Sequence, residues 1–280
     1  MRLVLLTALA LTAFAANSVL NRFAVGMGQI DPVSFAVVRL LAGAAMLAVL
    51  VGFRSLAGGV VWPGWPGRLA GVLGLTFYLF AFSLAYVALD AGAGALILFG
   101  AVQITMFGGA LLARDVVPRL RWAGAGMAFS GLVVLLWPGM GVPLSLPHAV
   151  LMAGAGVGFG VYSLAGRRAG DPLAGTAWNF VLSVPLGLAA GLALGVMPAG
   201  TTGLEVLLAV VSGAVTSGLG YAIWYSVVPA LGSGRAAVAQ LSVPVLTALA
   251  GIVFLGEAVD ARFIAAAAFV LGGVALASRS

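Results

Sequence analysis

Long apolar segments, separated by short stretches that hold nearly all the charged residues, are the feature that most limits how this chain can fold. They occupy residues 3–21, 32–53, 68–88, 91–113, 120–137, 147–166, 172–195, 204–228, 234–255 and 260–278. A helix needs about 20 apolar residues to cross the ~30 Å hydrocarbon core of a bilayer. The regular apolar–polar alternation of a membrane β-barrel is absent from the sequence. The sequence therefore predicts an all-α integral membrane protein with ten transmembrane helices.

The amino-acid composition also indicates an integral membrane protein. Only 7 % of the 280 residues are charged and 63 % are hydrophobic, whereas about 25 % of the residues in a soluble domain are charged. The first segment, with Arg2 before an apolar stretch, also resembles a cleavable signal peptide. We favour a retained first helix, because its removal would leave nine crossings and break the internal repeat described below.

The basic residues, all 13 of them arginine, predict an orientation for the helices. With the N-terminus inside, the inner segments hold Arg2, Arg54, Arg68, Arg114, Arg119, Arg121, Arg167, Arg168, Arg235 and Arg279. The outer segments hold only Arg22 and Arg262, together with five acidic residues. Because cytoplasmic loops carry an excess of basic residues, both termini are expected in the cytoplasm. Arginines scattered in this way do not form the clustered basic face that nucleic-acid binding requires.

The chain also repeats itself. The dipeptide Asp31-Pro32 recurs 140 residues later as Asp171-Pro172, and residues 88–132 match residues 230–274, with Asp115 opposite Glu257. We expect one membrane domain made of a first five-helix repeat at 1–140 and a second at 141–280. A repeat with an odd number of helices must insert the second copy upside down. Inverted repeats around a site at the membrane midplane are typical of transporters.

These features resemble the EamA-type drug/metabolite transporter superfamily: five plus five helices, the Asp-Pro start followed by Arg39, and Gly256-Glu257 at the end of the ninth helix. The short, neutral, aromatic-rich chain resembles the bacterial aromatic amino-acid exporter branch. The resemblance implies a carrier of the bacterial inner membrane with a central cavity between the halves. The chain departs from the repeat at Pro244, whose counterpart in the fourth helix is Val102.

Polar and aromatic side chains inside the spans are the candidate substrate ligands, because they are costly in lipid unless they face a cavity or a partner helix. They are Asn17, Tyr78, Ser83, Tyr86, Gln103, Tyr162, Trp178, Tyr221, Trp224, Gln240 and Ser242. Aromatic rings suit flat apolar ligands and cations, and neutral amides suit an amino-acid head group. Each aromatic residue could instead serve packing or an interfacial belt, and each amide could join two helices. Pro244 is expected to free the carbonyl of Gln240.

The charged candidates have structural or gating roles. Arg39 lies well within the second span and could contact a substrate carboxylate, pair with Asp31 or Asp90, or extend to the surface; we weigh a structural pairing above substrate contact. Glu257, like Asp115, is expected near a membrane face as a helix-end or gate contact.

The leading hypothesis is a secondary transporter that exports small neutral or zwitterionic metabolites, with aromatic amino acids the best guess. The alternative is a proton-coupled exporter of lipophilic cations, weakened by the lack of an acidic residue in the first helix.

The absence of lysine disfavours phosphorylated substrates. The absence of cysteine and the single histidine, His148, exclude thiolate and multi-histidine metal sites. We therefore expect no enzyme, metal or cofactor. Scattered polar residues do not predict a channel. The sequence is compatible with a monomer or a homodimer. It is also compatible with either proton-coupled transport or facilitated diffusion.

Overall fold

The computed structural model describes residues 1–28, 30–61, 64–114, 117–137, 144–166, 170–194 and 203–277. All the regular structure in these ranges is helical. The first half contains α1 (Arg2–Asn21) with its π-helical extension η1 (Arg22–Gly26), α2 (Pro32–Leu56), α3 (Arg68–Ala85), α4 (Ala91–Leu112) and α5 (Arg119–Leu136). Asp115, Arg167, Arg168 and Arg279 of the sequence analysis lie outside the described residues.

The second half follows the same order. It contains α6 (Leu146–Gly166), α7 (Pro172–Ala193), a continuous run of α8 (Gly203–Val210), η2 (Val211–Leu219) and α9 (Gly220–Leu231), then α10 (Ser233–Gln240), α11 (Ser242–Leu255) and α12 (Ala261–Ala277). Within the described ranges, nine helical runs are long and apolar enough to cross a membrane, and α12 is a shorter apolar helix of 17 residues. The prediction of an all-α membrane protein is confirmed.

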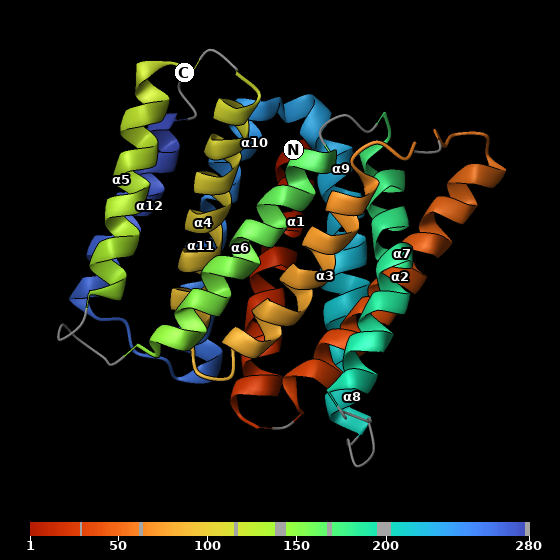
Figure 1. Ribbon diagram of the computed structural model, residues 1–280, viewed down its shortest axis with the longest axis horizontal. Helices are drawn as coiled ribbons and strands as arrows, with labels where there is room; N and C mark the ends of the chain where they lie inside the picture. The colour runs from red at the N-terminus through yellow and green to blue at the C-terminus, as the bar shows by residue number, and fades with distance from the viewer. Residues whose placement is uncertain are drawn as a thin grey trace.

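The helices form a bundle in which helices from the two halves pack against each other. Figure 1 shows α5 beside α12 at one edge of the bundle and α2 beside α7 at the other, in agreement with their contacts. Between these edges, α6 packs on α3 and α4, and α1 packs on α9 and α11. The N-terminus and the end of α12 lie on the same side of the bundle (Figure 1).

Both Asp-Pro dipeptides begin a helix. Asp31 accepts hydrogen bonds from the backbone N–H groups of Val33 and Ser34, at 2.9 and 3.1 Å, and Asp171 accepts one from Ala174 at 3.1 Å. The proline that follows each aspartate occupies the first turn, where its missing N–H has no helical partner to lose. The repeated dipeptide therefore marks equivalent helix starts in the two halves.

The two halves differ where the sequence departs from its repeat. Helix α4 runs without interruption through Val102. Its counterpart is broken, since α10 ends at Gln240 and α11 begins at Ser242, two residues before Pro244. Proline has no N–H to donate to the carbonyl four residues earlier, so the break falls where the sequence predicts a freed carbonyl.

Glycine contacts bring helices from the two halves close together. A Cβ atom built on Gly74 of α3 would lie 2.7 Å from the carbonyl oxygen of Gly158 on α6, and the converse distance is 2.8 Å. On α12, a Cβ at Gly273 would lie 2.6 Å from the backbone nitrogen of Ala128 on α5. Small residues permit this approach, which supplies the van der Waals contact that holds helices together in lipid.

Two glycines of α5 provide a matched test of this packing. Gly124 faces the backbone of α12 and is buried, whereas a Cβ at the exposed Gly126 would meet nothing within 4 Å. We expect Gly124→Ala to lower the melting temperature of the detergent-solubilised protein, because α5 and α12 must separate. Gly126→Ala should leave it unchanged or raise it slightly, since alanine favours helix by up to about 1 kcal/mol. Equal effects in a thermal-stability assay would contradict this packing.

An ion pair joins the last turn of α2 to the start of α7. The guanidinium of Arg54 donates to the carboxylate of Asp171 at 2.8 Å. Burial alone would raise the pKa of Asp171, but the N–H of Ala174 and the Arg54 guanidinium outweigh it and leave that pKa below its ordinary value. The ionised form of Asp171 therefore stabilises the folded protein.

This stabilisation is present above the ordinary pKa of an aspartate and is lost as the pH falls through the lowered pKa. We expect Asp171→Asn, which keeps a capping oxygen, to cost about 1 kcal/mol at neutral pH, or roughly 2–4 °C in melting temperature. The difference from the wild type should shrink toward zero as the pH is lowered below 4. A difference that stays constant across this range would show that the carboxylate charge contributes nothing.

Candidate functional site

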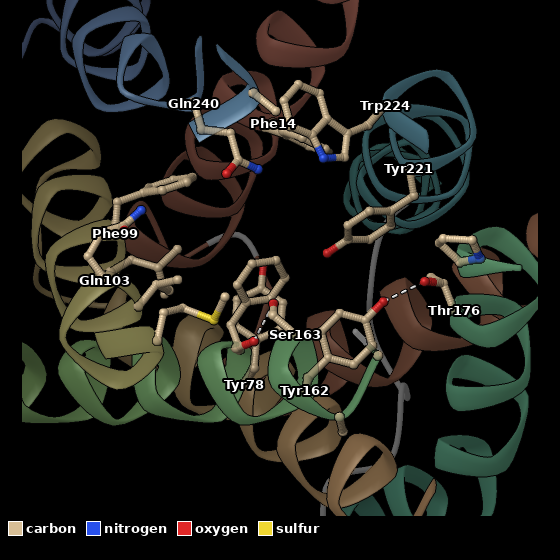
Figure 2. Close-up of a pocket in the computed structure, with 18 of the residues that line it drawn as sticks. Phe14, Tyr78, Phe99, Gln103, Tyr162, Ser163, Thr176, Tyr221, Trp224 and Gln240 are labelled. Atoms are coloured by element: carbon tan, nitrogen blue, oxygen red, sulfur yellow. Dashed lines mark hydrogen bonds between the residues drawn. The ribbon is translucent and has the colours of Figure 1, made fainter. Parts of the chain in front are cut away.

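A cavity of about 990 Å³ lies between the two halves. Its lining residues come from α1, α3, α4 and α5 of the first half and from α6, α7, η2, α9, α10 and α12 of the second. Figure 2 shows aromatic and amide side chains arranged around the central space. Ligand sites in proteins have volumes of about 300–1,000 Å³ and are mostly apolar with a few polar groups, so this cavity is the candidate site.

One wall of the cavity is a row of rings on α3 and α6. The ring centroids of Tyr78 and Phe159 are 5.1 Å apart, and those of Phe159 and Tyr162 are 5.6 Å apart. Phe82 continues the row along α3, 5.3 Å from Tyr78. These separations are within the 4.5–7 Å range of aromatic pairs, so the rings support each other as one surface.

The opposite wall is built on α1 and α9. Phe14 of α1 lies 5.6 Å from Tyr221 and 6.0 Å from Trp224, and Tyr221 stacks on Tyr225 at 6.1 Å. Figure 2 shows Phe14, Trp224 and Tyr221 on the side of the space that faces Tyr78 and Tyr162. A flat ligand in the cavity can therefore contact rings on two sides.

Hydroxyl groups connect the two walls. The hydroxyl oxygens of Tyr162 and Thr176 are 2.6 Å apart, and Thr176 also donates to the hydroxyl of Tyr225 at 3.2 Å. The first of these bonds is drawn in Figure 2. This chain links α6, α7 and α9, so a movement of one wall must disturb the other.

Neutral amides line the remainder of the cavity. Gln103 of α4 and Gln240 of α10 lie on the side that Phe99 also lines (Figure 2). Asn17 of α1 accepts hydrogen bonds from the hydroxyls of Ser212, at 2.6 Å, and Thr216, at 3.3 Å, through its side-chain carbonyl. The amide thus joins α1 to η2, as an interhelical role requires, and also borders the cavity.

Seven of the eleven predicted ligands line this cavity: Asn17, Tyr78, Gln103, Tyr162, Tyr221, Trp224 and Gln240. Ser83 and Tyr86 are not among the lining residues. The hydroxyl of Ser83 accepts a hydrogen bond from Asn21 at 3.0 Å, and the hydroxyl of Tyr86 donates to the carbonyl of Ala91 at 3.2 Å. Both are buried, Ser83 in the last turn of α3 and Tyr86 directly after it.

Ser242 and Trp178 also lie away from the lining residues. The hydroxyl of Ser242 donates to the carbonyl of Ala239 at 2.7 Å, across the break between α10 and α11. Trp178 is 38 % exposed on α7, whose cavity-lining residues are Pro172, Gly175, Thr176 and Asn179. Its position far from the helix ends therefore reflects a lipid-facing ring rather than a cavity-facing one.

Phe14 and Thr176 line the cavity although the sequence analysis did not select them. Phe14 precedes Asn17 by three residues, so helical spacing places both on one face of α1. That spacing is a signal that could have identified Phe14. Thr176 carries no comparable signal, because its role depends on Tyr162 and Tyr225 from two other helices.

Positive charge lies at one end of the cavity. Arg68, the first residue of α3, and Arg121, in the first turn of α5, line it. Both helices begin on the side of the bundle that carries the N-terminus (Figure 1). Arg68 donates to the carbonyl of Gly175 at 2.9 Å and to the side-chain oxygen of Asn179 at 2.6 Å. Among the lining residues in the described ranges none is acidic.

An ionic network lies at the opposite face, where α1 ends. The guanidinium of Arg22 lies 3.3 Å from Asp90 and 3.4 Å from Glu257. Glu257 accepts from the N–H of Ala91, at the start of α4, through both carboxylate oxygens at 2.8 and 2.9 Å. Burial raises the pKa of Glu257 above its ordinary value. The network joins α1, α4 and the segment after α11.

Arg39 is almost completely buried, with 1 % of its surface exposed. Its Nη2 donates to the hydroxyl of Tyr78 at 3.0 Å. The two acidic partners considered from the sequence are engaged elsewhere, since Asp31 caps α2 and Asp90 contacts Arg22. The side chain does not reach the surface either. Behind the wall of rings, Arg39 therefore carries a charge that no acidic residue in the described ranges neutralises.

The apolar helices define a multi-pass membrane protein, and comparisons with known proteins indicate the transporter class. The sequence profile of the EamA-like transporter family matches residues 146–279. The uncharacterized protein PA1977 of Pseudomonas aeruginosa is 46 % identical over 276 residues, which cover 98 % of this chain and 94 % of that protein. A solved protein crystal structure superposes on this chain with a TM-score of 0.67, over 97 % of both chains and at 22 % identity. This similarity is one of fold.

Residues 146–279 of the chain thus carry a domain of the EamA-like transporter family. Members of this family are membrane transporters rather than enzymes. The apolar helices in the described ranges are consistent with a membrane protein of this type.

Trp224 and Trp178 allow a matched test of the cavity. Trp224 lines it, whereas Trp178 lies outside it. We expect Trp224→Ala to reduce transport by proteoliposomes about tenfold, because removal of a stacking ring costs roughly 1.4 kcal/mol or more. Trp178→Ala should transport at the wild-type rate when the amount of inserted protein is equal. The reverse result would place the substrate on the outer face of α7.

Proposed function

We propose that this protein is a secondary exporter of small neutral or zwitterionic metabolites, with aromatic amino acids the preferred substrates. The observation that carries the proposal is the cavity between the halves, with aromatic rings on two sides and neutral amides between them. Rings supply stacking surface for a flat side chain. Amides supply donors and acceptors for a head group without fixing a buried charge.

Two inverted five-helix repeats, 1–140 and 141–280, form the transport unit in this proposal. The contacts support it, because α5 packs on α12, α2 on α7 and α4 on α11, each a helix with its own counterpart in the repeat. The pair α3–α6 likewise has α1–α9 as its counterpart. Helix α1 begins on the side of the N-terminus and α6 begins on the opposite side (Figure 1), as inversion requires.

Alternating access follows from the asymmetry of the cavity. The cavity reaches Arg68 and Arg121 on the side of the N-terminus, while Arg22, Asp90 and Glu257 join three segments at the other face. With the arginine-rich side in the cytoplasm of a bacterium, this is an inward-facing state. The network around Arg22 is the proposed outer gate, which must open for release.

The alternative substrate class, lipophilic cations, has less support. Aromatic walls attract cations, but the lining in the described ranges has no acidic residue and includes two arginines. A permanent cation would enter against this charge. An amino acid would bring a carboxylate toward it.

Flux measurements in proteoliposomes test the proposal. We expect saturable flux of labelled L-phenylalanine and L-tryptophan, slower flux of L-threonine, and little flux of an ethidium-like cation. Each substrate is measured with and without a pH gradient, against empty liposomes. Movement of the cation alone, and only with the gradient, would replace this proposal with proton-coupled drug export.

A further inference from the structure

Arg39 lies directly behind the aromatic wall of the cavity. Its guanidinium carbon is 5.4 Å from the ring centroid of Tyr78 and 4.9 Å from that of Phe82, and both rings line the cavity. The charge is therefore separated from the ligand space by a single layer of side chains.

The charge of Arg39 is poorly compensated in this position. Among the described residues, Nη2 alone has a hydrogen-bond partner, the hydroxyl of Tyr78, and the buried Nε and Nη1 have none. Contact with two ring faces supplies some attraction. A buried cation without an anionic partner is nevertheless costly, and an ionisable residue at this depth in a membrane protein usually marks a functional site.

The hydrogen bond between these residues has a fixed direction. A guanidinium can only donate, so Arg39 donates and the Tyr78 oxygen accepts. The hydroxyl hydrogen of Tyr78 is then free to be donated elsewhere, and no acceptor for it is found among the described residues. A donor whose oxygen already accepts from a cation is strengthened, because linked hydrogen bonds polarise one another.

We propose that the Tyr78 hydroxyl, polarised by Arg39, binds the carboxylate of the transported metabolite. Tyr78 touches the ligand, and Arg39 acts through it as a positioning residue that also supplies the positive charge. The site selects substrates that carry a carboxylate beside an apolar or aromatic body. This inference rests on the proposed function, because it assigns the substrate class of the same cavity.

A neutral isostere of an aromatic carboxylate tests the inference. Binding of 3-phenylpropanoate and of 3-phenylpropanamide to the detergent-solubilised full chain is measured by titration calorimetry, since the two have nearly the same shape and differ in the head group, an anionic carboxylate or a neutral amide. We expect the wild type to bind the carboxylate about tenfold more tightly than the amide, the size of one charge-assisted hydrogen bond.

The variants separate recognition from structure. Tyr78→Phe removes only the hydroxyl, and Arg39→Met removes the charge with little change in volume. In both variants the carboxylate and the amide should bind with about equal affinity. Arg39→Lys should restore part of it. Tyr86→Phe is the matched control, because it removes a tyrosine hydroxyl directly after α3 at a position outside the cavity lining, and its preference should equal that of the wild type.

Each outcome has a distinct meaning. Equal binding of both compounds by the wild type would overturn this inference while leaving the proposed export function intact. A preference that survives in Tyr78→Phe would do the same, and a preference that survives also in Arg39→Met would reduce Arg39 to a packing role. Binding of neither compound, together with no flux of L-phenylalanine, would overturn the proposed function itself. The wild-type comparison holds even where a variant at Arg39 fails to fold.

Discussion

The hydrocarbon layer contains no water, and this constraint decides where every polar group of the chain can lie. Backbone groups are satisfied within helices, and side chains must meet one another or border a cavity. The structure follows this constraint at most positions, although two buried nitrogens of Arg39 have no hydrogen-bond partner among the described residues. Asn21 meets Ser83 and Asn17 meets the hydroxyls of η2. Four of the five tyrosines, together with Gln103 and Gln240, line one space between the halves. Polar side chains of the membrane-spanning helices are therefore tolerated around the cavity, and a polar substrate can bind there.

Close contact between the halves gives this cavity its shape. At Gly74 and Gly158 the backbones of α3 and α6 touch, and at Gly124 and Gly273 those of α5 and α12 do so. At these contact points the helices are held together without polar side chains. The hydroxyl chain through Thr176 and the network around Arg22 are different, because each depends on directional bonds among three segments. In the proposed transport cycle, helices slide past each other at the glycine contacts, while the directional bonds break and form. The directional bonds therefore distinguish one conformation of the cycle from the next.

Much of the fold followed from the sequence, because the properties that determine it are local. Apolar length predicted the helices, and Asp31-Pro32 and Asp171-Pro172 predicted two helix starts that the structure contains. The cavity was harder, since whether a ring faces lipid or a ligand depends on the neighbouring helix. Tyr78 and Trp178 look alike along the chain, yet one lines the cavity and the other is exposed. The environment of Arg39 could not be predicted from the sequence for the same reason. An acidic partner was expected, but the partner is a tyrosine on another helix, 39 residues away.

The distribution of charge connects these observations to the substrate. Arg68 and Arg121 stand at the inner end of the cavity and Arg39 stands behind Tyr78, while two of the nearby acidic residues are engaged by Arg22 at the far face. A carboxylate that enters therefore approaches positive charge along its whole path. The ammonium group of a zwitterion needs acceptors instead, and the amides of Gln103 and Gln240 line another side of the same space. Donors on one side and acceptors on another fit a molecule whose two charges are separated, which neither a lipophilic cation nor a phosphate provides.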